Sequence, residues 1–303
     1  ESYGSAASYN YMVEKLGFTT LTQRDSQQSG NMGLGGYDVG VTTEEMAAAY
    51  AAIANDGVYT KPRTWLRVED SEGNVVMENE TSAHSAMKET TAYLLRDILE
   101  SVITSGTGTE AYFSGMTIAG KTGTTDDNRD RYFVGFSPYY CAAVWTGYES
   151  NDELSYGMGN GSAQLWKQVM REIHADLEDK GFDSCTGLTQ VTVCSDSGLL
   201  ATDACTKDLR GSRVRTVTVA ADTAPTATCN VHKMVDYCTE GKHIATQYCP
   251  KDKVKQVAVL DFERTEYFRE GVRIGSITTD SAKNPDSMFH LIEMKRAIVL
   301  EPT

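Results

Sequence analysis

The stretch Gly120-Lys121-Thr122-Gly123-Thr124-Thr125 decides the fold, because of the two runs that flank it. Met116-Thr117-Ile118-Ala119 precedes it and Arg131-Tyr132-Phe133-Val134-Gly135-Phe136 follows it. Both runs are rich in β-branched and aromatic residues, which favour strands. The stretch therefore lies on a strand and presents a cation, hydroxyl groups and a glycine without a side chain. Such a set on a strand edge predicts a surface that binds an anion and stabilises an oxyanion.

Strands that follow one another closely are predicted around this stretch, over 115–125, 131–138 and 139–148. Their connections are too short for a crossover, so an antiparallel meander is expected. Further β-like runs cover 58–69 and 74–79, which the turn signal Asp70-Ser71-Glu72-Gly73 joins.

Four helices are predicted from their end signals and periodicity, over 5–17, 44–55, 89–104 and 162–179. Gly17 has the place of a left-handed terminating glycine, and Thr42 forms a capping-box pattern with Glu45. Two apolar stripes are expected to face the core: Leu95, Ile98, Leu99 and Val102 on one helix, and Leu165, Val169, Ile173 and Leu177 on the other. Trp145 and Trp166 are expected to pack in the core. Helices on antiparallel strands predict an α+β domain over 1–180, an antiparallel sheet flanked by helices.

Composition excludes some partners. The 303 residues carry a formal net charge of −14, which argues against nucleic acid and against anionic membrane surfaces. No window approaches the roughly 18–20 apolar residues that a membrane-spanning helix needs. No targeting signal is visible at the N-terminus, so we expect either a cytosolic protein or one whose N-terminal part is absent.

Cysteines favour the second option, because six of the seven lie in the C-terminal third: Cys185, Cys194, Cys205, Cys229, Cys238 and Cys249. Cys194 to Cys205 and Cys238 to Cys249 have the same spacing, a weak internal repeat. The pattern predicts disulfides, and hence a small disulfide-rich β module over 185–250 in an oxidising compartment. Zinc held by Cys229-x-x-His232 is the alternative, but no second close-spaced ligand pair accompanies it, so no metal and no cofactor is predicted.

Two remaining parts have simpler interpretations. Cys141 lies in an apolar strand and is expected to be a buried, inert thiol. Residues 251–303 are predicted to form a β-like tail of unknown role.

Several segments together resemble the class A (bifunctional) penicillin-binding proteins, in the order of that family and over about residues 10–180. The matching segments are Gly40 to Tyr50, Thr91-Ala92-Tyr93, Ser105-Gly106-Thr107-Gly108, Ala119 to Thr125, Asp130 to Pro138 and Val144 to Tyr148. Residues 194–201 are similar to C-terminal extensions of some of these proteins.

The resemblance implies a peptidoglycan D,D-transpeptidase, in which a serine is acylated by a stem peptide and β-lactams imitate that peptide. In such an enzyme Lys121 is catalytic, and the Thr124 backbone N–H supplies half of the oxyanion hole. The hydroxyls of Thr122 and Thr124 bind the substrate carboxylate, and Gly123 lets the substrate lie against the strand. The implied partners are peptidoglycan stem peptides and β-lactams. The implied location is extracytoplasmic, with a membrane anchor only in a missing N-terminal part.

The other two motifs of that family, Ser-x-x-Lys and Ser-x-Asn, are not found in suitable places. Ser85-Ala86-Met87-Lys88 has the first form but directly precedes a predicted helix, where Ser85 suits an N-cap or a loop. Ser8-Tyr9-Asn10 has the second form but lies inside a predicted helix. Both functional motifs are therefore expected before residue 1, and the chain alone is expected to be inactive.

Two alternatives remain. Gly115-x-x-x-x-Gly120-Lys121-Thr122 formally matches a phosphate-binding loop, which requires a helix directly after it. Alternatively, the chain is a non-catalytic extracellular protein in which 185–303 binds the wall or a partner and 1–180 is a transpeptidase remnant.

Overall fold

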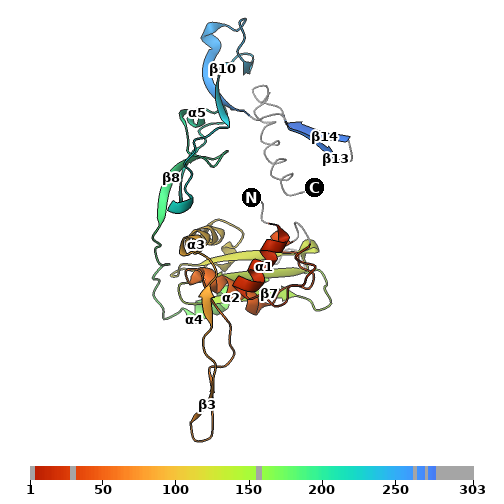
Figure 1. Cartoon of the computed structure of the whole chain (residues 1–303), viewed down its shortest axis with the longest axis vertical. Helices are drawn as coiled ribbons and strands as arrows, with labels where there is room; N and C mark the ends of the chain where they lie inside the picture. Colours follow the sequence, from red (N-terminus) through yellow and green to blue (C-terminus); the bar gives the residue numbers. More distant parts are fainter. Residues whose placement is uncertain (1–3, 28–31, 155–158, 262–264, 270–271, 278–303) are drawn as a thin grey trace. The chain divides into compact units, whose positions relative to one another are not determined.

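The computed structural model describes residues 4–27, 32–154, 159–261, 265–269 and 272–277, with side chains up to residue 261. The chain divides into two compact units, Glu1–Thr186 and Gly187–Thr303, called here the N-terminal and C-terminal units (Figure 1). Within the described ranges, no helix combines the length and the apolar character that crossing a bilayer requires.

The centre of the N-terminal unit is an antiparallel sheet in the order β5-β6-β7. Its strands are β5 (Ala119–Thr124), β6 (Asp130–Phe136) and β7 (Cys141–Gly147). Each pair runs in register without a bulge, from Ala119 opposite Phe136 to Thr124 opposite Arg131 in the first pair. The predicted antiparallel meander is therefore confirmed.

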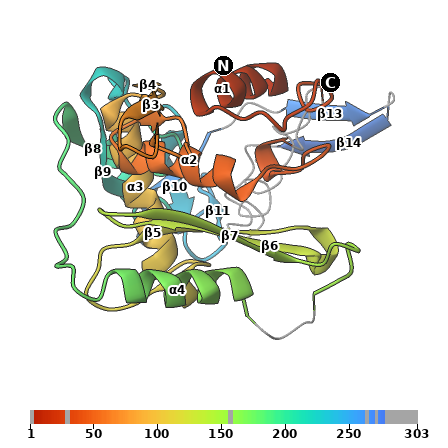
Figure 2. The same cartoon turned by 90° about the horizontal axis from the view of Figure 1, so that it is seen from below.

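Helices cover both faces of this sheet, with α2 and α4 on opposite sides (Figure 2). The helices are α1 (Ser5–Leu16), α2 (Thr43–Ala54), α3 (Glu89–Thr104) and α4 (Gly161–Ile173). The expected end signals are present: Gly17 is left-handed with φ 69°, and Thr42 and Glu45 form the capping box. Short 3-10 turns of this unit are η1 (Met32–Leu34), η2 (Thr109–Ala111) and η3 (Asp126–Asn128).

Alternation along β6 sends its aromatic side chains to different layers. Phe133 packs against Trp166 of α4, with ring centroids 5.0 Å apart. Phe136 instead joins a cluster with Leu99 of α3 and Ala119 of β5. The sheet is thus buried on both faces.

The predicted inner face of α4 is wrong, and the helix ends at Ile173 rather than near residue 179. Leu165, Val169 and Ile173 are 47%, 50% and 48% exposed. The buried residues are Ala163, Trp166 and Met170, so the core stripe is rotated toward the large indole. After the helix, the Nδ1 of His174 donates to the carbonyl of Met170, and its Nε2 lies 2.7 Å from the Ser137 hydroxyl. These contacts fix the chain there.

The inner face of α3 is also rotated from the prediction. Leu99 is buried as expected, but Ile98 is 59% exposed and Arg96 is buried. Arg96 donates from Nη1 to Asp56 and from Nη2 to the carbonyl of Asp183 at 3.2 Å. A buried guanidinium with such partners occupies a core position that hydrophobic periodicity does not reveal.

Trp145 likewise departs from its predicted core position. It is 40% exposed and donates to Asp130, whereas Trp166 is buried as expected.

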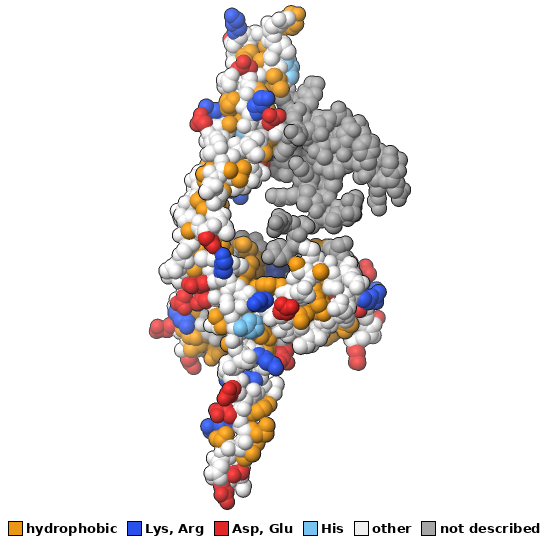
Figure 3. Space-filling view, viewed as in Figure 1, with side chains coloured by type: hydrophobic (Ala, Val, Ile, Leu, Met, Phe, Trp, Pro, Cys, Tyr) orange, Lys and Arg blue, Asp and Glu red, His pale blue; other side chains and the backbone are white. Residues whose placement is uncertain are grey.

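The predicted strand over 58–69 divides in two, because Pro62 lacks the N–H that a ladder needs. Its ends are β1 (Val58–Thr60), which pairs with β4 (Ala83–Ser85), and β2 (Arg67–Glu69), which pairs with β3 (Val75–Glu78). The β2–β3 hairpin closes through the predicted turn at Asp70 to Gly73 and extends away from the rest of its unit (Figure 1). It exposes apolar side chains along its length (Figure 3), including Val76 and Met77.

The C-terminal unit contains small antiparallel sheets. The hairpin β8 (Leu188–Cys194)–β9 (Val214–Ala220) is followed by a sheet in the order β11-β10-β12, and β13 pairs with β14. The elements are β10 (His232–Cys238), β11 (His243–Ile244), β12 (Val254–Leu260), β13 (Thr265–Arg269), β14 (Val272–Ile277), α5 (Asp203–Thr206), η4 (Ala221–Thr223) and η5 (Lys251–Lys253). β12 pairs with β10 over its whole length, so one sheet crosses the limit predicted between 250 and 251. The part of the predicted tail at 262–264, 270–271 and 278–303 lies outside the described residues.

The predicted disulfides are not confirmed, and all seven cysteines are free thiols in the structure. Instead, three of the sulfurs gather with a histidine ring, as described below. Cys141 fits its prediction in part: it is partly buried, burial raises the pKa of its thiol to about 12, and its Sγ contacts the carbonyl of Ala47.

Candidate active site on strand β5

Strand β5 is at the edge of its sheet among the described strands, and the ladder shows which of its N–H groups are unpaired. Thr125 N–H donates to the carbonyl of Asp130 at 3.1 Å, in the same register as the rest of the pair. Because inward and outward groups alternate in an antiparallel ladder, the N–H groups of Thr122 and Thr124 point away from β6. The outer edge of β5 therefore offers backbone donors, as an oxyanion site requires.

The side chains of the same strand add charge and hydroxyls to this edge. Lys121 is exposed, and its Nζ donates to the carbonyl of Thr122 at 2.8 Å. The Oγ1 of Thr122 lies 2.7 Å from the Oγ1 of Thr107, in the turn after α3. Two of the segments quoted from the sequence, 105–108 and 119–125, are thus side by side.

The two glycines of β5 have different surroundings. A Cβ on Gly120 would lie 2.8 Å from both the Phe133 ring and the carbonyl of Val134, so internal packing requires that glycine. A Cβ on Gly123 would meet only the Cβ of Tyr132, at 3.2 Å. The space over Gly123 is otherwise open, which leaves room for an external chain to approach.

The structure gives local roles to the misleading motifs. Ser85 is the last residue of β4, paired with Val58, and not an N-cap, which corrects its predicted place. Its hydroxyl contacts the carbonyl of Met87 at 3.3 Å, and Lys88 has the N-cap position of α3. Ser8 lies within α1 as predicted.

The phosphate-loop alternative is wrong. Residues 119–124 form a strand, and a 3-10 turn follows at Asp126–Asn128. The motif needs a helix beginning at its Lys-Thr pair, so that the helix dipole and N–H groups meet a phosphate.

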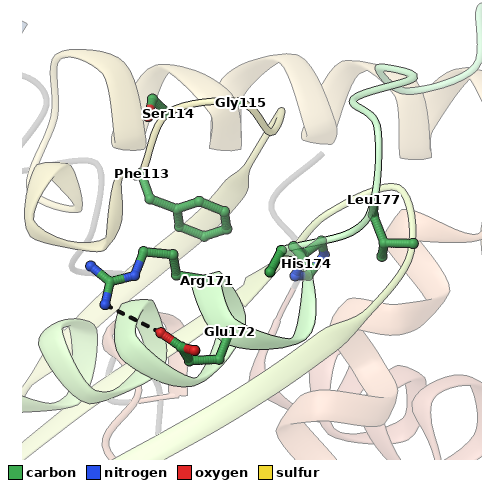
Figure 4. A pocket seen from close by; sticks show the side chains of 8 residues that line it. Phe113, Ser114, Gly115, Arg171, Glu172, His174 and Leu177 are labelled. Carbon is green, nitrogen blue, oxygen red and sulfur yellow. Dashed lines mark hydrogen bonds and ion pairs between the residues drawn. The ribbon is translucent and has the colours of Figure 1, made fainter.

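A pocket of about 370 Å³ lies at the C-terminal end of α4 (Figure 4), and no residue of β5 lines it. Its lining includes Phe113, Arg171, Glu172 and His174. The buried His174 ring lies 2.7 Å from Ser137 Oγ, which resembles a nucleophile–base pair. However, Ser137 Oγ accepts the N–H groups of Tyr139 and Tyr140, both at 3.1 Å, so the pair organises the β6–β7 turn.

Metal-ligand side chains gather only in the C-terminal unit, as far as the described residues go. One group has four members, and two have three: Cys238, His243 and Cys249, and Asp196, Asp208 and His232. The sequence places Cys229 and His232 close together but shows no further metal ligands near them.

Comparison with known proteins finds matches over parts of both units. Residues 3–171 match the family described as "Penicillin binding protein transpeptidase domain", and residues 184–234 match "Penicillin-binding protein 1A, C-terminal domain". The chain is similar to penicillin-binding protein 1A of Clostridium perfringens, at 34% identity over 232 residues, which are 76% of this chain and 27% of that protein. It is also similar to penicillin-binding protein 1A/1B of Bacillus subtilis, at 34% identity over 53% of this chain and 19% of that protein.

Solved structures share the fold. Penicillin-binding protein 1A of Haemophilus influenzae superimposes with a TM-score of 0.56 at 19% identity, covering 72% of this chain and 37% of that one. The PonA1 protein of Mycobacterium tuberculosis, solved in complex with penicillin V, gives 0.50 at 23% identity, covering 60% of this chain and 52% of that one.

The chain belongs to the penicillin-binding protein transpeptidase family. Its relatives include several proteins named penicillin-binding protein 1A, and the chain spans about a fifth to a third of their length.

Proposed function

We propose that the N-terminal unit forms the β5 side of a peptidoglycan D,D-transpeptidase site, which cross-links stem peptides by serine acyl transfer. The observation that carries this proposal is the outer edge of β5. There, the unpaired N–H of Thr124, the exposed Lys121 ammonium and the Thr122 hydroxyl occur on one short strand.

Each group has a distinct task in this proposal. The Thr124 N–H donates to the oxyanion that forms when a serine attacks the D-Ala carbonyl. The Lys121 ammonium and the hydroxyls of Thr122 and Thr124 bind the terminal carboxylate, which β-lactams imitate. Gly123 leaves the strand bare where the substrate lies, which agrees with the open space over it.

The serine–lysine pair of the reaction is not supplied by Ser85 and Lys88, which have structural positions at the end of β4 and the start of α3. We therefore expect the 303-residue chain alone to remain unlabelled by a fluorescent penicillin. Stem peptides and β-lactams are the proposed partners. An extracytoplasmic location, with anchoring outside these residues, follows from the same activity.

The test is acylation of the full-length native protein by fluorescent penicillin. Lys121→Ala should lower the acylation rate by about 10²-fold or more, because a positioned cation and donor set stabilises the charged intermediate. Ser85→Ala is the control and should leave the rate unchanged. Equal rates for Lys121→Ala and the wild type would refute the proposed role, and labelling at Ser85 would overturn the proposal for the isolated chain.

The non-catalytic wall-binding alternative is not favoured, because the family match covers 3–171 and the β5 edge retains its donors. Retention of peptidoglycan by the chain, with no acylation of the full-length protein, would restore it.

A further inference from the structure

Four metal-ligand side chains of the C-terminal unit meet at one point: Cys194, Cys205, Cys229 and His232. Their ligand atoms all lie within 4.8 Å of one another. Cys194 and Cys205 are fully buried, and the His232 side chain is 0% exposed. Cys229 is partly buried. The three sulfurs and one ring nitrogen make four ligands, the number that fills a tetrahedral site.

Separate elements deliver these ligands. Cys194 ends β8, Cys205 is in α5, and His232 begins β10 three residues after Cys229. Backbone bonds hold them in place: Arg213 N–H donates to the carbonyl of Cys205, and Cys229 N–H donates to that of Leu200, both at 2.8 Å. The site is therefore built by the fold and not by one flexible loop.

The distances suit a tetrahedral ion. His232 Nδ1 lies 3.4 Å from Cys194 Sγ and 3.3 Å from Cys229 Sγ. Around a tetrahedral zinc with Zn–S of about 2.3 Å and Zn–N of about 2.0–2.1 Å, nitrogen and sulfur are roughly 3.6 Å apart. The observed distances are slightly shorter, so a small outward movement of the side chains accommodates the ion.

The other ring nitrogen of His232 has the partner that a metal-bound histidine usually has. Nε2 lies 2.9 Å from Asp208 Oδ2, so it carries the proton and leaves the Nδ1 lone pair toward the sulfurs. Arg210 bridges Asp208 and Asp196, with contacts of 2.9 Å to each. These arginine–carboxylate contacts hold Asp208 where it orients the His232 ring.

Backbone donors also reach the sulfurs. Asp196 N–H lies 3.4 Å from Cys194 Sγ, and Thr202 N–H lies 3.3 Å from Cys205 Sγ. Such N–H donors add contacts around the sulfurs that a metal would share. A disulfide within the cluster would involve two of the three sulfurs. It would not explain why the third thiol and the histidine ring lie beside them.

The C-terminal unit needs a stabilising centre of this kind. β8 and β9 form a two-stranded hairpin, which is marginally stable by itself. The buried aromatic and aliphatic cluster of the unit, Tyr237, Val257 and Val259, lies instead on β10 and β12. A small module with a thin core commonly depends on a metal or on cross-links.

We propose that Cys194, Cys205, Cys229 and His232 bind one structural Zn²⁺, which joins β8 and α5 to the start of β10. Three thiolates and one imidazole in a closed tetrahedral set suit zinc and leave no position for substrate. This site is separate from β5, and its test does not depend on transpeptidase activity.

The test is zinc content of the purified 303-residue chain after dialysis, measured by elemental analysis. We expect Cys229→Ser to bind one equivalent of zinc less than the wild type. Cys185→Ser, which changes a thiol outside the cluster, should leave the content unchanged.

Cobalt substitution of the wild-type chain gives a second measurement that does not require a folded variant. Bound Co²⁺ should show the intense visible bands of tetrahedral coordination and thiolate-to-metal charge transfer in the near ultraviolet. Equal zinc in the wild type and Cys229→Ser, or a cobalt spectrum without thiolate bands, would overturn the proposal. So would intact mass and peptide mapping that show Cys194, Cys205 or Cys229 in a disulfide.

Discussion

Glu45 organises the region between α1 and α2 through one buried carboxylate. The backbone N–H groups of Thr19 and Thr42 donate to it at 2.6 and 2.9 Å, and the Thr20 hydroxyl donates at 2.8 Å. Burial raises the pKa of Glu45, but these hydrogen bonds outweigh burial and lower the pKa to about 2. The sequence predicted its capping partner Thr42, but not the contacts to Thr19 and Thr20, which come from a distant loop.

Since the folded pKa lies below that of the unfolded chain, Glu45 stabilises the fold above about pH 4.5, and this contribution is lost as the pH falls toward 2. Glu45→Gln should lower the free energy of unfolding by roughly 2–3 kcal/mol at pH 7 and by less at pH 3. Urea unfolding at both pH values measures this. Glu44→Gln, an exposed neighbour in the same helical turn, is the control. An equal loss at pH 7 and pH 3 would contradict the assigned cause.

At the same scale, β5 shows what residue patterns do and do not reveal. The strand and its edge follow from β-branched flanks and short connections, so both were predictable. The pairing of Thr122 with Thr107 was not, because the hydroxyl contact depends on how the turn after α3 folds back. Both segments, 105–108 and 119–125, carry the family resemblance, but the sequence does not show that they are neighbours in the fold.

Among the elements, helix limits were predicted best where a cap fixes them, as at Gly17 and Thr42. Helix faces were predicted less well. On α4, Leu165, Val169 and Ile173 recur at every fourth residue, yet the large Trp166 ring turns the adjacent face inward. On α3, the buried Arg96 is satisfied by groups that only the folded chain brings near.

The corrected face of α4 makes a direct prediction. Met170 is 1% exposed beside Trp166, whereas Leu165 is 47% exposed. Met170→Ala should therefore lower the free energy of unfolding by about 2–5 kcal/mol, through lost burial and the cavity left behind. Leu165→Ala should cost less than about 1 kcal/mol. Thermal and urea unfolding of both variants measure these losses. A larger loss for Leu165→Ala than for Met170→Ala would instead support the inner face predicted from the sequence.

The weak internal repeat also acquires a meaning at this scale. In each copy a strand ends in cysteine, and a threonine N–H then contacts a second cysteine sulfur: Thr202 with Cys205 and Thr246 with Cys249, both at 3.3 Å. The equal spacing of the two cysteine pairs predicted disulfides. The structure shows that the repeat encodes a turn around a sulfur.

For the whole molecule, the family match over 3–171 agrees with the α+β fold expected around β5, while the C-terminal unit was the least predictable part. Its four converging ligands are spread over 194–232, and only Cys229 and His232 lie within a few positions of each other. Only folding of β8, α5 and β10 brings the set together.

Metal removal is expected to affect the two units differently. A strong zinc chelator should increase amide hydrogen exchange in residues 188–238 of the full chain, because those segments converge on the cluster. Exchange in α2, α3 and the β5-β6-β7 sheet should not change. Hydrogen-exchange mass spectrometry with and without chelator measures both regions together. Unchanged exchange in 188–238 would argue against a structural ion.

The unpaired outer edge of β5 also affects the association of the isolated chain. Its outward N–H groups have no strand partner among the described residues and can pair with an extended segment. The proposed segment is a substrate peptide that joins the sheet as an extra strand. Without a bound peptide, a second molecule of the chain can pair with this edge through its own β5. Self-association at high concentration is therefore expected to compete with ligand for one and the same surface.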